Sequence, residues 1–290
     1  MSRSKSNKNK KCDPNTINNQ SKSSEEQNWF CQKLEQILTD KYMESVPDDY
    51  THLLNLLTKP KNMTQKSDKN FRVEKVLAEL IDELTVEERY KLIPKTLAES
   101  KMMKKFIRTY KMELDDDTIW RKVTGYPNLN FQLTKALAEK MKGKKTLEIM
   151  AGNGLLSYML REDGIDTFAT DISPDKSNEY IAMRNGSYGD IKKMDAISAV
   201  KKYGHSMDYL MCSWPPQGEE EVLHALETFT KMKKNAILIY IGEWKGGFNA
   251  TAEFFERLEI VEKMDEVNAL HLSHFGANDV IRMVRLKAKS

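Results

Sequence analysis

Residues 147–157 read LEIMAGNGLLS, and this stretch decides the fold. A short apolar strand carries an acid, Glu148, and the small-residue loop AGNG follows it at residues 151–154. Glycine is needed where the backbone turns tightly or approaches a ligand without a side chain in between. The apolar residues after the loop open a helix, so the stretch predicts a strand, a ligand-facing loop and a helix in succession.

Outward from this stretch, short β-rich runs alternate with helical runs from about residue 130 onward. The expected strands are residues 146–150, 167–171, 207–212 and 236–241, and the expected helices are residues 155–161, 196–203, 219–231 and 251–258. Strands that alternate with helices form a parallel sheet covered on both faces. Residues 259–263 and 280–286 have no convincing helix between them, which predicts an antiparallel strand pair at one edge.

Two further acids are expected where neighbouring strands end. Asp171 ends the second strand, seventeen residues after Gly154, where an acid can accept hydrogen bonds from both ribose hydroxyls of a nucleoside. Asp195 follows the third strand, where it either meets an adenine amino group or caps the next helix. Together with Glu148 and the glycine loop, these acids predict a nucleoside cofactor across the carboxyl ends of the first strands.

A dinucleotide cofactor is disfavoured by the glycine spacing. A pyrophosphate sits on a helix N-terminus, normally through the pattern G-x-G-x-x-G. From Gly152 the chain reads G-N-G-L-L-S, so Ser157 stands at the third glycine position. An NAD(P)-dependent oxidoreductase is therefore the least favoured interpretation.

The same residues are similar to the first motif of class I S-adenosylmethionine-dependent methyltransferases, E/D-x-G-x-G-x-G. Glu148, Gly152 and Gly154 match this motif, and Met150 stands where the family has its first glycine. The resemblance covers about residues 130–290. It implies an α/β fold with a seven-stranded, mostly parallel, Rossmann-like sheet that ends in a C-terminal antiparallel strand pair.

The resemblance also implies a cofactor, S-adenosyl-L-methionine, and the residues that bind it. The methionine portion would be held by Glu148, Ala151, Gly152, Asn153 and Gly154, the ribose by Asp171 and the adenine by Asp195. Methyl transfer is an in-line displacement that depends mostly on holding the reactants collinear, so a metal is not required.

The expected fourth strand is followed by Ser213, Trp214, Pro215 and Pro216. Two prolines fix the backbone and remove two N–H donors, which predicts a stiff loop with outward carbonyls. Amino-methyltransferases that act on planar nitrogens carry D/N/S-P-P-aromatic here, and this chain resembles them in part, with W-P-P-Q and Ser213 one place early. Ser213, Trp214 and Pro215 are therefore candidate acceptor-binding residues. The alternative is a rigid turn with Trp214 packed into the core.

A second candidate wall follows the fifth strand. Glu243 could orient or deprotonate an acceptor, and Trp244 could stack on it, because ligands of open α/β sheets bind at the strand carboxyl ends. The alternative is an exposed, flexible loop. His271 and His274, in HLSH, lack a paired acid or cysteine, so no metal site is expected.

The part of the chain before residue 130 differs in kind. Residues 1–24 hold six Lys/Arg, one acid and almost nothing apolar, which predicts a disordered basic tail. Residues 25–129 predict a helical N-terminal domain, with apolar residues at helical spacing and a capping box at Thr85 and Glu88. This domain resembles no family known to us and is a candidate surface for a partner.

Composition narrows the possible partners and the cellular setting of the protein. The chain has 290 residues, a net charge of +3, three cysteines and no apolar run long enough to cross a membrane. We expect no membrane partner, a reducing cytoplasmic or nuclear setting, and no binding to nucleic acid by bulk charge alone. The methyl acceptor stays open between a small molecule, a protein and a nucleic acid. A catalytically silent, methyltransferase-fold scaffold is the alternative to an active enzyme.

Overall fold

The structure is a computed structural model that describes residues 29–42, 46–58, 73–109, 118–174, 187–274 and 277–288. The chain divides into two compact units, residues 1–63 and residues 64–290. The predicted basic tail, residues 1–24, lies outside the described residues. The predicted boundary between a helical domain and an α/β domain at residues 129/130 stays a prediction, because the second unit contains helices from both sides of it.

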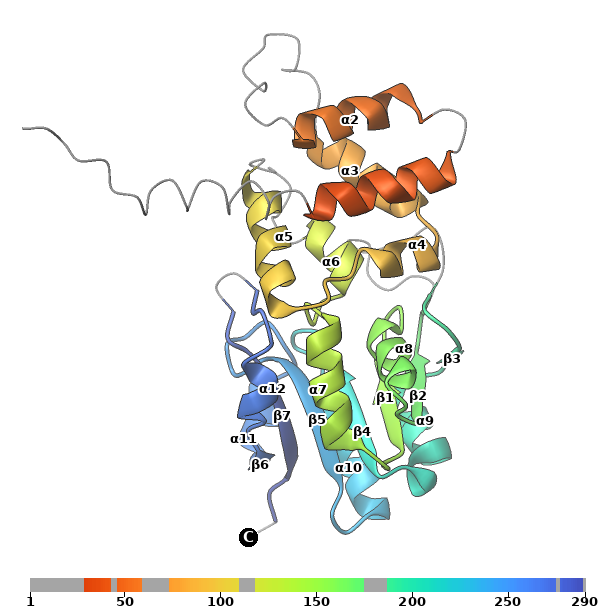
Figure 1. Cartoon of the computed structure of the whole chain (residues 1–290). Helices are drawn as coiled ribbons and strands as arrows, with labels where there is room; N and C mark the ends of the chain where they lie inside the picture. The colour runs from red at the N-terminus through yellow and green to blue at the C-terminus, as the bar shows by residue number, and fades with distance from the viewer. Residues whose placement is uncertain are drawn as a thin grey trace, which may run out of the picture. The chain divides into compact units, whose positions relative to one another are not determined.

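The second unit is built on one sheet of seven strands in the order β3-β2-β1-β4-β5-β7-β6 (Figure 1). The strands are β1 Thr146–Ile149, β2 Thr167–Asp171, β3 Ile191–Lys193, β4 Tyr209–Ser213, β5 Ile237–Glu243, β6 Leu258–Glu262 and β7 Asp279–Leu286. Neighbours from β3 to β5 pair in parallel, and β7 pairs antiparallel with both β5 and β6. The predicted fold class and the antiparallel edge pair are confirmed.

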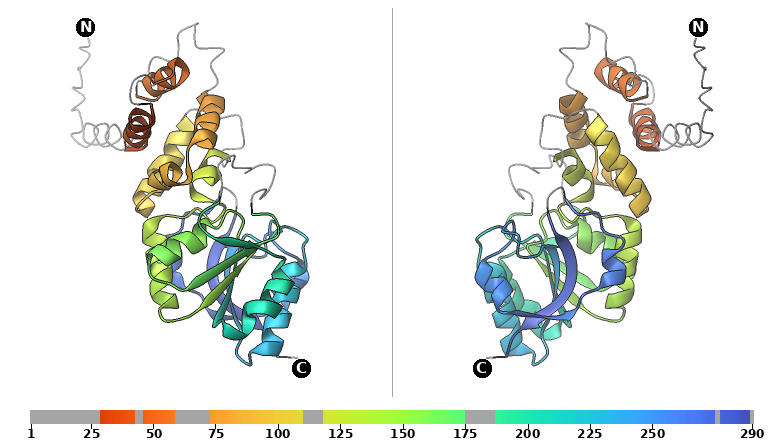
Figure 2. Two further views of the ribbon diagram at one scale, coloured as in Figure 1. Left: turned by 90° about the vertical axis from the view of Figure 1, so that its right-hand side faces the viewer. Right: turned by 90° about the vertical axis from the view of Figure 1, so that its left-hand side faces the viewer.

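Helices cover both faces of this sheet, as a parallel sheet requires. They are α7 Phe131–Met141, α8 Leu155–Glu162, α9 Ala196–Tyr203, α10 Glu221–Met232, α11 Ala252–Glu256 and α12 Asp265–Asn268. Figure 2 shows α7 and α8 on one face, and α9 and α10 on the other. The second face is sealed by a single apolar cluster that joins strand residues such as Leu210 and Leu238 to Leu226 and Phe229 of α10.

The boundaries of the predicted strands and helices differ from the observed ones by about two residues at most, and two helices from residue 130 onward, α7 and α12, were not predicted. The fourth strand begins at Tyr209 instead of Met207, because a 3₁₀ turn at Gly204–Ser206 precedes it. The helix α12, between β6 and β7, was not expected. Its four residues are too few to show a helical periodicity in the sequence.

Among the described residues of the same unit, four further helices precede α7: α3 Val73–Glu83, α4 Val86–Lys91, α5 Leu97–Thr109 and α6 Thr118–Thr124. Leu77, Leu80 and Ile81 of α3 follow one another at helical spacing, and all three are fully buried. The predicted capping box is confirmed, because the Thr85 hydroxyl accepts from the backbone N–H of Glu88 and the Glu88 carboxylate accepts from that of Thr85. These helices lead the chain to the edge where β1, β2 and β4 end.

The first unit, as far as it is described, is helical. Residues 29–41 form one helix and α2 spans Asp48–Thr58. Leu34, Ile37 and Leu38 are buried, so the first of these helices has one apolar face that packs inward.

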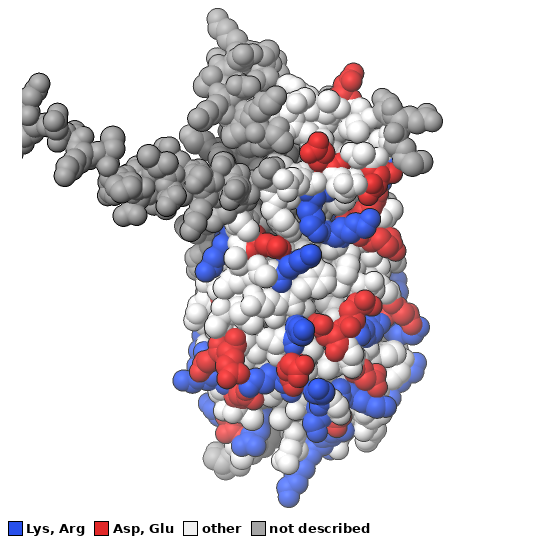
Figure 3. All heavy atoms as spheres, viewed as in Figure 1, with Lys and Arg blue, Asp and Glu red and all other residues white. Residues whose placement is uncertain are grey.

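The surface carries both charges. Figure 3 shows Lys and Arg interspersed with Asp and Glu over the face that holds α7 and α8. Within the described residues, none of the helices is both long and apolar enough to span a membrane.

Gly154 is required by the packing around the loop that follows β1. It precedes α8 with a φ of 75°, in the left-handed region that favours glycine. A Cβ at this position would lie 2.6 Å from Ile191 Cδ1 and 3.0 Å from the backbone oxygen of Tyr188. The backbone N–H of Tyr188 in turn donates to the carbonyl of Asn153 at 2.7 Å, so this close approach holds the loop in place.

We expect Gly154→Ala to lower the free energy of unfolding by about 2–4 kcal/mol, from left-handed strain together with steric overlap. Gly143→Ala is the matched control, because Gly143 has a φ of 71° and open space around its missing Cβ. In that control the free energy of unfolding should fall by about 1–2 kcal/mol, from backbone strain alone. Urea unfolding measures both variants, and equal losses would show that Ile191 and Tyr188 do not restrict the site.

Candidate functional site

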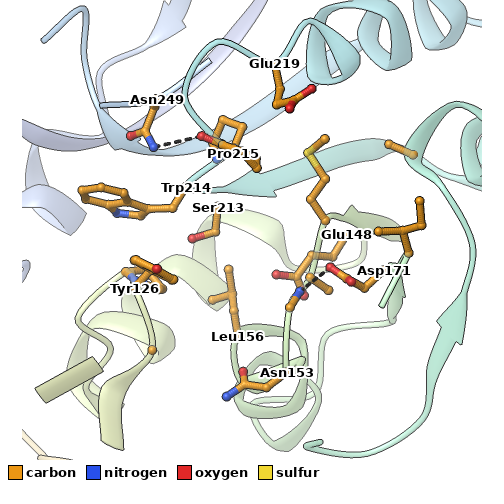
Figure 4. A pocket seen from close by; sticks show the side chains of 18 of the residues that line it. Tyr126, Glu148, Asn153, Leu156, Asp171, Ser213, Trp214, Pro215, Glu219 and Asn249 are labelled. Carbon is orange, nitrogen blue, oxygen red and sulfur yellow. Dashed lines mark hydrogen bonds between the residues drawn. The ribbon is translucent and has the colours of Figure 1, made fainter. Parts of the chain in front are cut away.

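A cavity of about 730 Å³ opens where β1, β2 and β4 end, in the size range of small-molecule sites (Figure 4). Its walls come from the loops after β1, β2, β3 and β4, from Phe248 and Asn249 after β5, and from residues between 121 and 129. All of these belong to the second unit. The open edge of a parallel sheet is where this class of fold binds ligands.

Asp171 and the glycine loop are in direct contact. The backbone N–H of Gly152 donates to Asp171 Oδ2 at 2.8 Å, and that of Ser173 donates to Oδ1 at 2.7 Å. The backbone N–H of Ala151 donates to the carbonyl of Thr170 at 3.0 Å. The tips of β1 and β2 are thereby fastened together, and Ala151, Gly152, Asn153 and Asp171 all line the cavity.

Glu148 lies at the bottom of the cavity and is only 1% exposed. Burial raises the pKa of its carboxyl to about 7, and the charge of Asp171 adds to this rise. The hydrogen bond from the backbone N–H of Ser157, at 3.2 Å, and the charge of Arg161 act in the opposite direction. Near neutral pH the carboxyl is therefore poised between its charged and neutral forms.

Asp195 has the helix-capping position considered from the sequence, and it also lies at the cavity. It caps α9, where its Oδ1 accepts from the backbone N–H of Ser198 at 2.8 Å, and it also lines the cavity. The hydrogen bond from Ser198 lowers the pKa of this carboxyl, so it is ionised at neutral pH.

Gly154, expected to hold a cofactor, is not among the residues that line the cavity. It lies behind the loop, against Ile191 and the backbone of Tyr188. Its role in the structure is to let α8 begin close to β3, which corrects the expectation that it faces a ligand.

Two non-glycine residues at the cavity have strained backbones. Met150 has a φ of 54° and Trp214 a φ of 50°, and both side chains line the cavity. Left-handed backbone costs an L-residue roughly 1–2 kcal/mol, and such strain concentrates at functional sites. Met150 therefore keeps the conformation that a glycine would adopt at the first glycine position of the motif.

The loop after β4 brings Ser213, Trp214 and Pro215 to the cavity. Trp214 is both packed and cavity-lining, because its ring stacks on Tyr126 at 5.8 Å with an interplanar angle of 26°. Figure 4 shows these two rings together, across the cavity from Asp171. The Ser213 hydroxyl is shielded from solvent and has no hydrogen-bond partner among the described residues.

The expectation that the proline carbonyls point outward needs correction at both prolines. The carbonyl of Pro216 accepts from the backbone N–H of Ala250 at 3.0 Å. That of Pro215 accepts from Asn249 Nδ2 at 3.0 Å and from the same N–H of Ala250 at 3.3 Å. These bonds connect the loop after β4 to the loop after β5, so these carbonyls help to hold the cavity wall.

Glu243 and Trp244 do not line the cavity, which corrects the second candidate wall. Glu243 is 3% exposed, and its carboxylate accepts from the backbone N–H of Phe248 at 2.8 Å. The ring of Trp244 packs against Phe255, with the guanidinium of Arg282 over it at 4.2 Å from the centroid. Because Glu243 holds its own loop closed, Phe248 reaches the cavity in its place.

Arg121 and Tyr126 line the cavity but were not predicted from the sequence. The guanidinium of Arg121 lies over the Tyr126 ring, 5.2 Å from its centroid. Both residues come before β1 and belong to no motif, so only their packing against the sheet edge reveals them. Phe248 and Asn249 were equally hard to predict from the sequence, because the two glycines before them allow their loop many conformations.

The cavity has an acidic lining. Its described lining residues include Glu148, Asp171, Asp195, Glu219 and Glu221, against Arg121 as the one Lys or Arg. A cleft lined mostly by one sign of charge concentrates ligands of the opposite sign. The lining therefore suits a ligand with a cationic centre. In the part of the chain that the structure describes, no three His, Cys, Asp or Glu side chains gather as a metal site.

The strand order now decides the fold. A sheet in the order β3-β2-β1-β4-β5-β7-β6, with β7 alone reversed and a glycine loop after the central β1, is the class I methyltransferase sheet. The chain has the class I methyltransferase fold. No family model matches the sequence, and the search of curated proteins found no relative.

Several solved structures are similar to the chain at low identity. MtNAS, solved in complex with MTA and tNA, is 13% identical, with 90% of this chain and 98% of that chain covered at a TM-score of 0.38. The mitomycin 7-O-methyltransferase MmcR is 10% identical, with coverages of 94% and 97% and a TM-score of 0.36. A SAM-dependent methyltransferase from Agrobacterium tumefaciens is 10% identical, with coverages of 53% and 59% and a TM-score of 0.29.

The chain thus spans less than two thirds of the Agrobacterium methyltransferase. With TM-scores below 0.5, these similarities add nothing to the strand order, on which the fold assignment rests.

Two histidines, set aside as metal ligands, lie behind one cavity wall. His271 Nε2 lies 2.8 Å from the carbonyl oxygen of Pro127, and its Nδ1 has no partner within the described residues. A carbonyl can only accept, so Nε2 carries the proton. Burial lowers the pKa of His271 to about 4, and the bond to Pro127 opposes this shift less strongly.

This lowered pKa of His271 predicts that acid destabilises the folded protein. Between the ordinary histidine pKa of 6.5 and about 4, the unfolded chain binds a proton at His271 that the folded protein does not. The free energy of unfolding therefore falls as pH drops through this window, by up to about 3 kcal/mol, and this contribution is flat below pH 4. His271→Gln keeps a donor toward Pro127 without titrating, so its unfolding free energy should depend less steeply on pH from 6.5 to 4. Parallel curves for the two proteins, in urea unfolding at several pH values, would contradict the assignment.

Proposed function

We propose that the protein transfers a methyl group from S-adenosyl-L-methionine to an acceptor bound in the cavity. The observation that carries this proposal is the hydrogen bond from Gly152 to Asp171 at the rim of an open cavity. It places a carboxylate suited to ribose hydroxyls beside a glycine loop at the tips of adjacent parallel strands.

The cavity fits this cofactor in three respects. Each oxygen of a carboxylate can accept more than one hydrogen bond, so Asp171 can bind two ribose hydroxyls while it keeps its bonds to Gly152 and Ser173. The acidic lining suits a sulfonium, which is cationic. The volume of about 730 Å³ leaves room for an acceptor beside the cofactor.

The resemblance to class I methyltransferases implies which residues would hold the cofactor, and those named here all line the cavity. Asp171 would bind the ribose and Asp195 the adenine, while Ala151, Gly152, Asn153 and Glu148 would hold the methionine portion. When bound, the cofactor supplies an electrophilic methyl group for an in-line displacement.

The other side of the cavity would bind the acceptor. Trp214 and Tyr126 present aromatic rings there, beside Ser213, whose shielded hydroxyl has no partner among the described residues. A flat ring system binds well against such a wall, which supports a planar nitrogen as the acceptor atom. The residues act by orientation and exclusion of water, and orientation of reactants can contribute roughly 7–11 kcal/mol to catalysis.

Asp171→Ala should weaken the binding of S-adenosylhomocysteine about 10- to 100-fold, because hydrogen bonds to a charged group are lost. Calorimetric titration measures the dissociation constants. Asp190→Ala is the matched control: Asp190 is exposed, pairs with Lys192 and does not line the cavity. An Asp171→Ala variant that folds and binds as tightly as wild type would overturn the assignment of the ribose site.

Methyl transfer itself is tested with tritium-labelled S-adenosylmethionine, the purified protein and fractionated cell extract. We expect label to enter an acceptor that mass spectrometry identifies, and no label to enter it with Asp171→Ala. Binding of the cofactor without transfer to any fraction would favour the silent scaffold instead. Binding of a nicotinamide cofactor in place of S-adenosylhomocysteine would favour the oxidoreductase.

A further inference from the structure

The aromatic wall of the cavity, Tyr126 and Trp214, is held from behind by His274. His274 Nε2 lies 2.5 Å from the carbonyl oxygen of Tyr126, a residue 148 positions earlier in the chain. The imidazole also meets the Trp214 ring edge-on, with centroids 4.8 Å apart and an interplanar angle of 80°. His274 is 6% exposed and does not line the cavity, so any influence on a ligand passes through these two residues.

Three neighbouring side chains make bonds of the same kind. We use the name clasp for the two segments that these bonds join, residues 126–130 and residues 270–274. Besides the His274 bond, Asn128 Nδ2 donates to Leu272 O at 2.7 Å, His271 Nε2 to Pro127 O at 2.8 Å, and Asn130 Nδ2 to Leu270 O at 3.1 Å. The clasp therefore fixes a cavity wall by side chains from both segments.

Both sides of the clasp are anchored to regular structure. Asn130 also caps α7, where its Oδ1 accepts from the backbone N–H of Leu133 at 2.8 Å. On the other side, the backbone N–H of His274 donates to Oδ2 of the buried Asp279 at 2.8 Å. Asp279 begins β7 and lies opposite Glu243 of β5. The sheet thus fixes the position of His274, and His274 in turn fixes Tyr126 through a hydrogen bond and Trp214 through a ring contact.

The bond geometry gives His274 a defined role. The carbonyl of Tyr126 can only accept, so Nε2 of His274 must be the donor. Asn128, within the clasp, has a φ of 50°, and Trp214, in the wall, has the same φ of 50°, so the clasp and the wall each include a non-glycine residue in left-handed conformation. Such backbones persist only where surrounding contacts hold them. The His274 ring supplies one of these contacts to Trp214 directly.

We infer that His274 is a positioning residue for the acceptor half of the cavity. It sets the Tyr126 backbone and the Trp214 ring, and it leaves the cofactor half, built on Asp171 and the glycine loop, unaffected. This inference rests on the proposed function for the meaning of the two halves. The two histidines of the HLSH sequence thereby have a structural role and not a metal-binding one, because the Nε2 atoms of His271 and His274 each face a backbone carbonyl.

The experiment compares three variants. His274→Leu removes the donor, His274→Gln retains an N–H donor, and His224→Leu is the control, since His224 is half-exposed on α10. Hydrogen exchange followed by mass spectrometry reports on residues 121–130. Acrylamide quenching reports on Trp214, by difference from the same protein carrying Trp214→Phe. Titration with S-adenosylhomocysteine reports on the cofactor half.

We expect His274→Leu to speed exchange in residues 121–130 at least 10-fold and to raise the Trp214 quenching constant at least 2-fold. The S-adenosylhomocysteine dissociation constant should stay within 2-fold of wild type. His274→Gln should restore exchange to within about 3-fold of wild type, and His224→Leu should change nothing. With an acceptor fraction from the labelling experiment, His274→Leu should raise the acceptor KM at least 10-fold and leave the cofactor KM unchanged.

The inference would be overturned by unchanged exchange in residues 121–130 of His274→Leu, or by a loss of S-adenosylhomocysteine affinity as large as the change in exchange. Faster exchange throughout the chain would also overturn it, because that is the effect of general destabilisation. If wild type binds no S-adenosylhomocysteine, the proposed function fails, whereas exchange and quenching still decide whether His274 holds the wall.

Discussion

The hydrogen bond between the backbone N–H of Gly152 and the carboxylate of Asp171 is the contact on which the rest of the site depends. It joins the loop after β1 to the tip of β2 and gives one fixed edge to the cavity. The Asp171 carboxylate remains able to accept further hydrogen bonds, so the same group that shapes the loop can also bind a ligand. Without Asp171, the glycine loop would be only a turn between a strand and a helix. Without the loop, Asp171 would be only a charge on the surface.

The cavity joins two parts of the chain that differ in construction. The side of Asp171, Glu148 and Asp195 is made of loops that follow parallel strands, and burial and hydrogen bonds adjust its carboxyl groups in opposite directions. The side of Tyr126 and Trp214 is made of aromatic rings fastened from behind by the clasp. Strain at Met150 and Trp214 marks the boundary of the cavity on both sides.

Local patterns predicted the fold, and they predicted that Glu148, the glycine loop and Asp171 meet at one edge of the sheet, because their spacing reflects contacts between adjacent strands. The acceptor half was harder to predict. Arg121 and Tyr126 carry no motif, and only tertiary packing brings them to the edge of the sheet. Glu243 was expected in the cavity, but its carboxylate bonds to the backbone N–H of Phe248 and turns inward. The four-residue α12 was too short to leave a periodic signal.

The central claim is that S-adenosyl-L-methionine lies across the tips of β1 and β2. A crystal structure of the protein with S-adenosylhomocysteine tests it most directly. Our account predicts that the ribose hydroxyls donate to the Asp171 carboxylate and that the thioether sulfur points toward Trp214. Crystals in which the compound is bound away from Asp171, or in which Met150 fills its place despite saturating compound, would contradict the account.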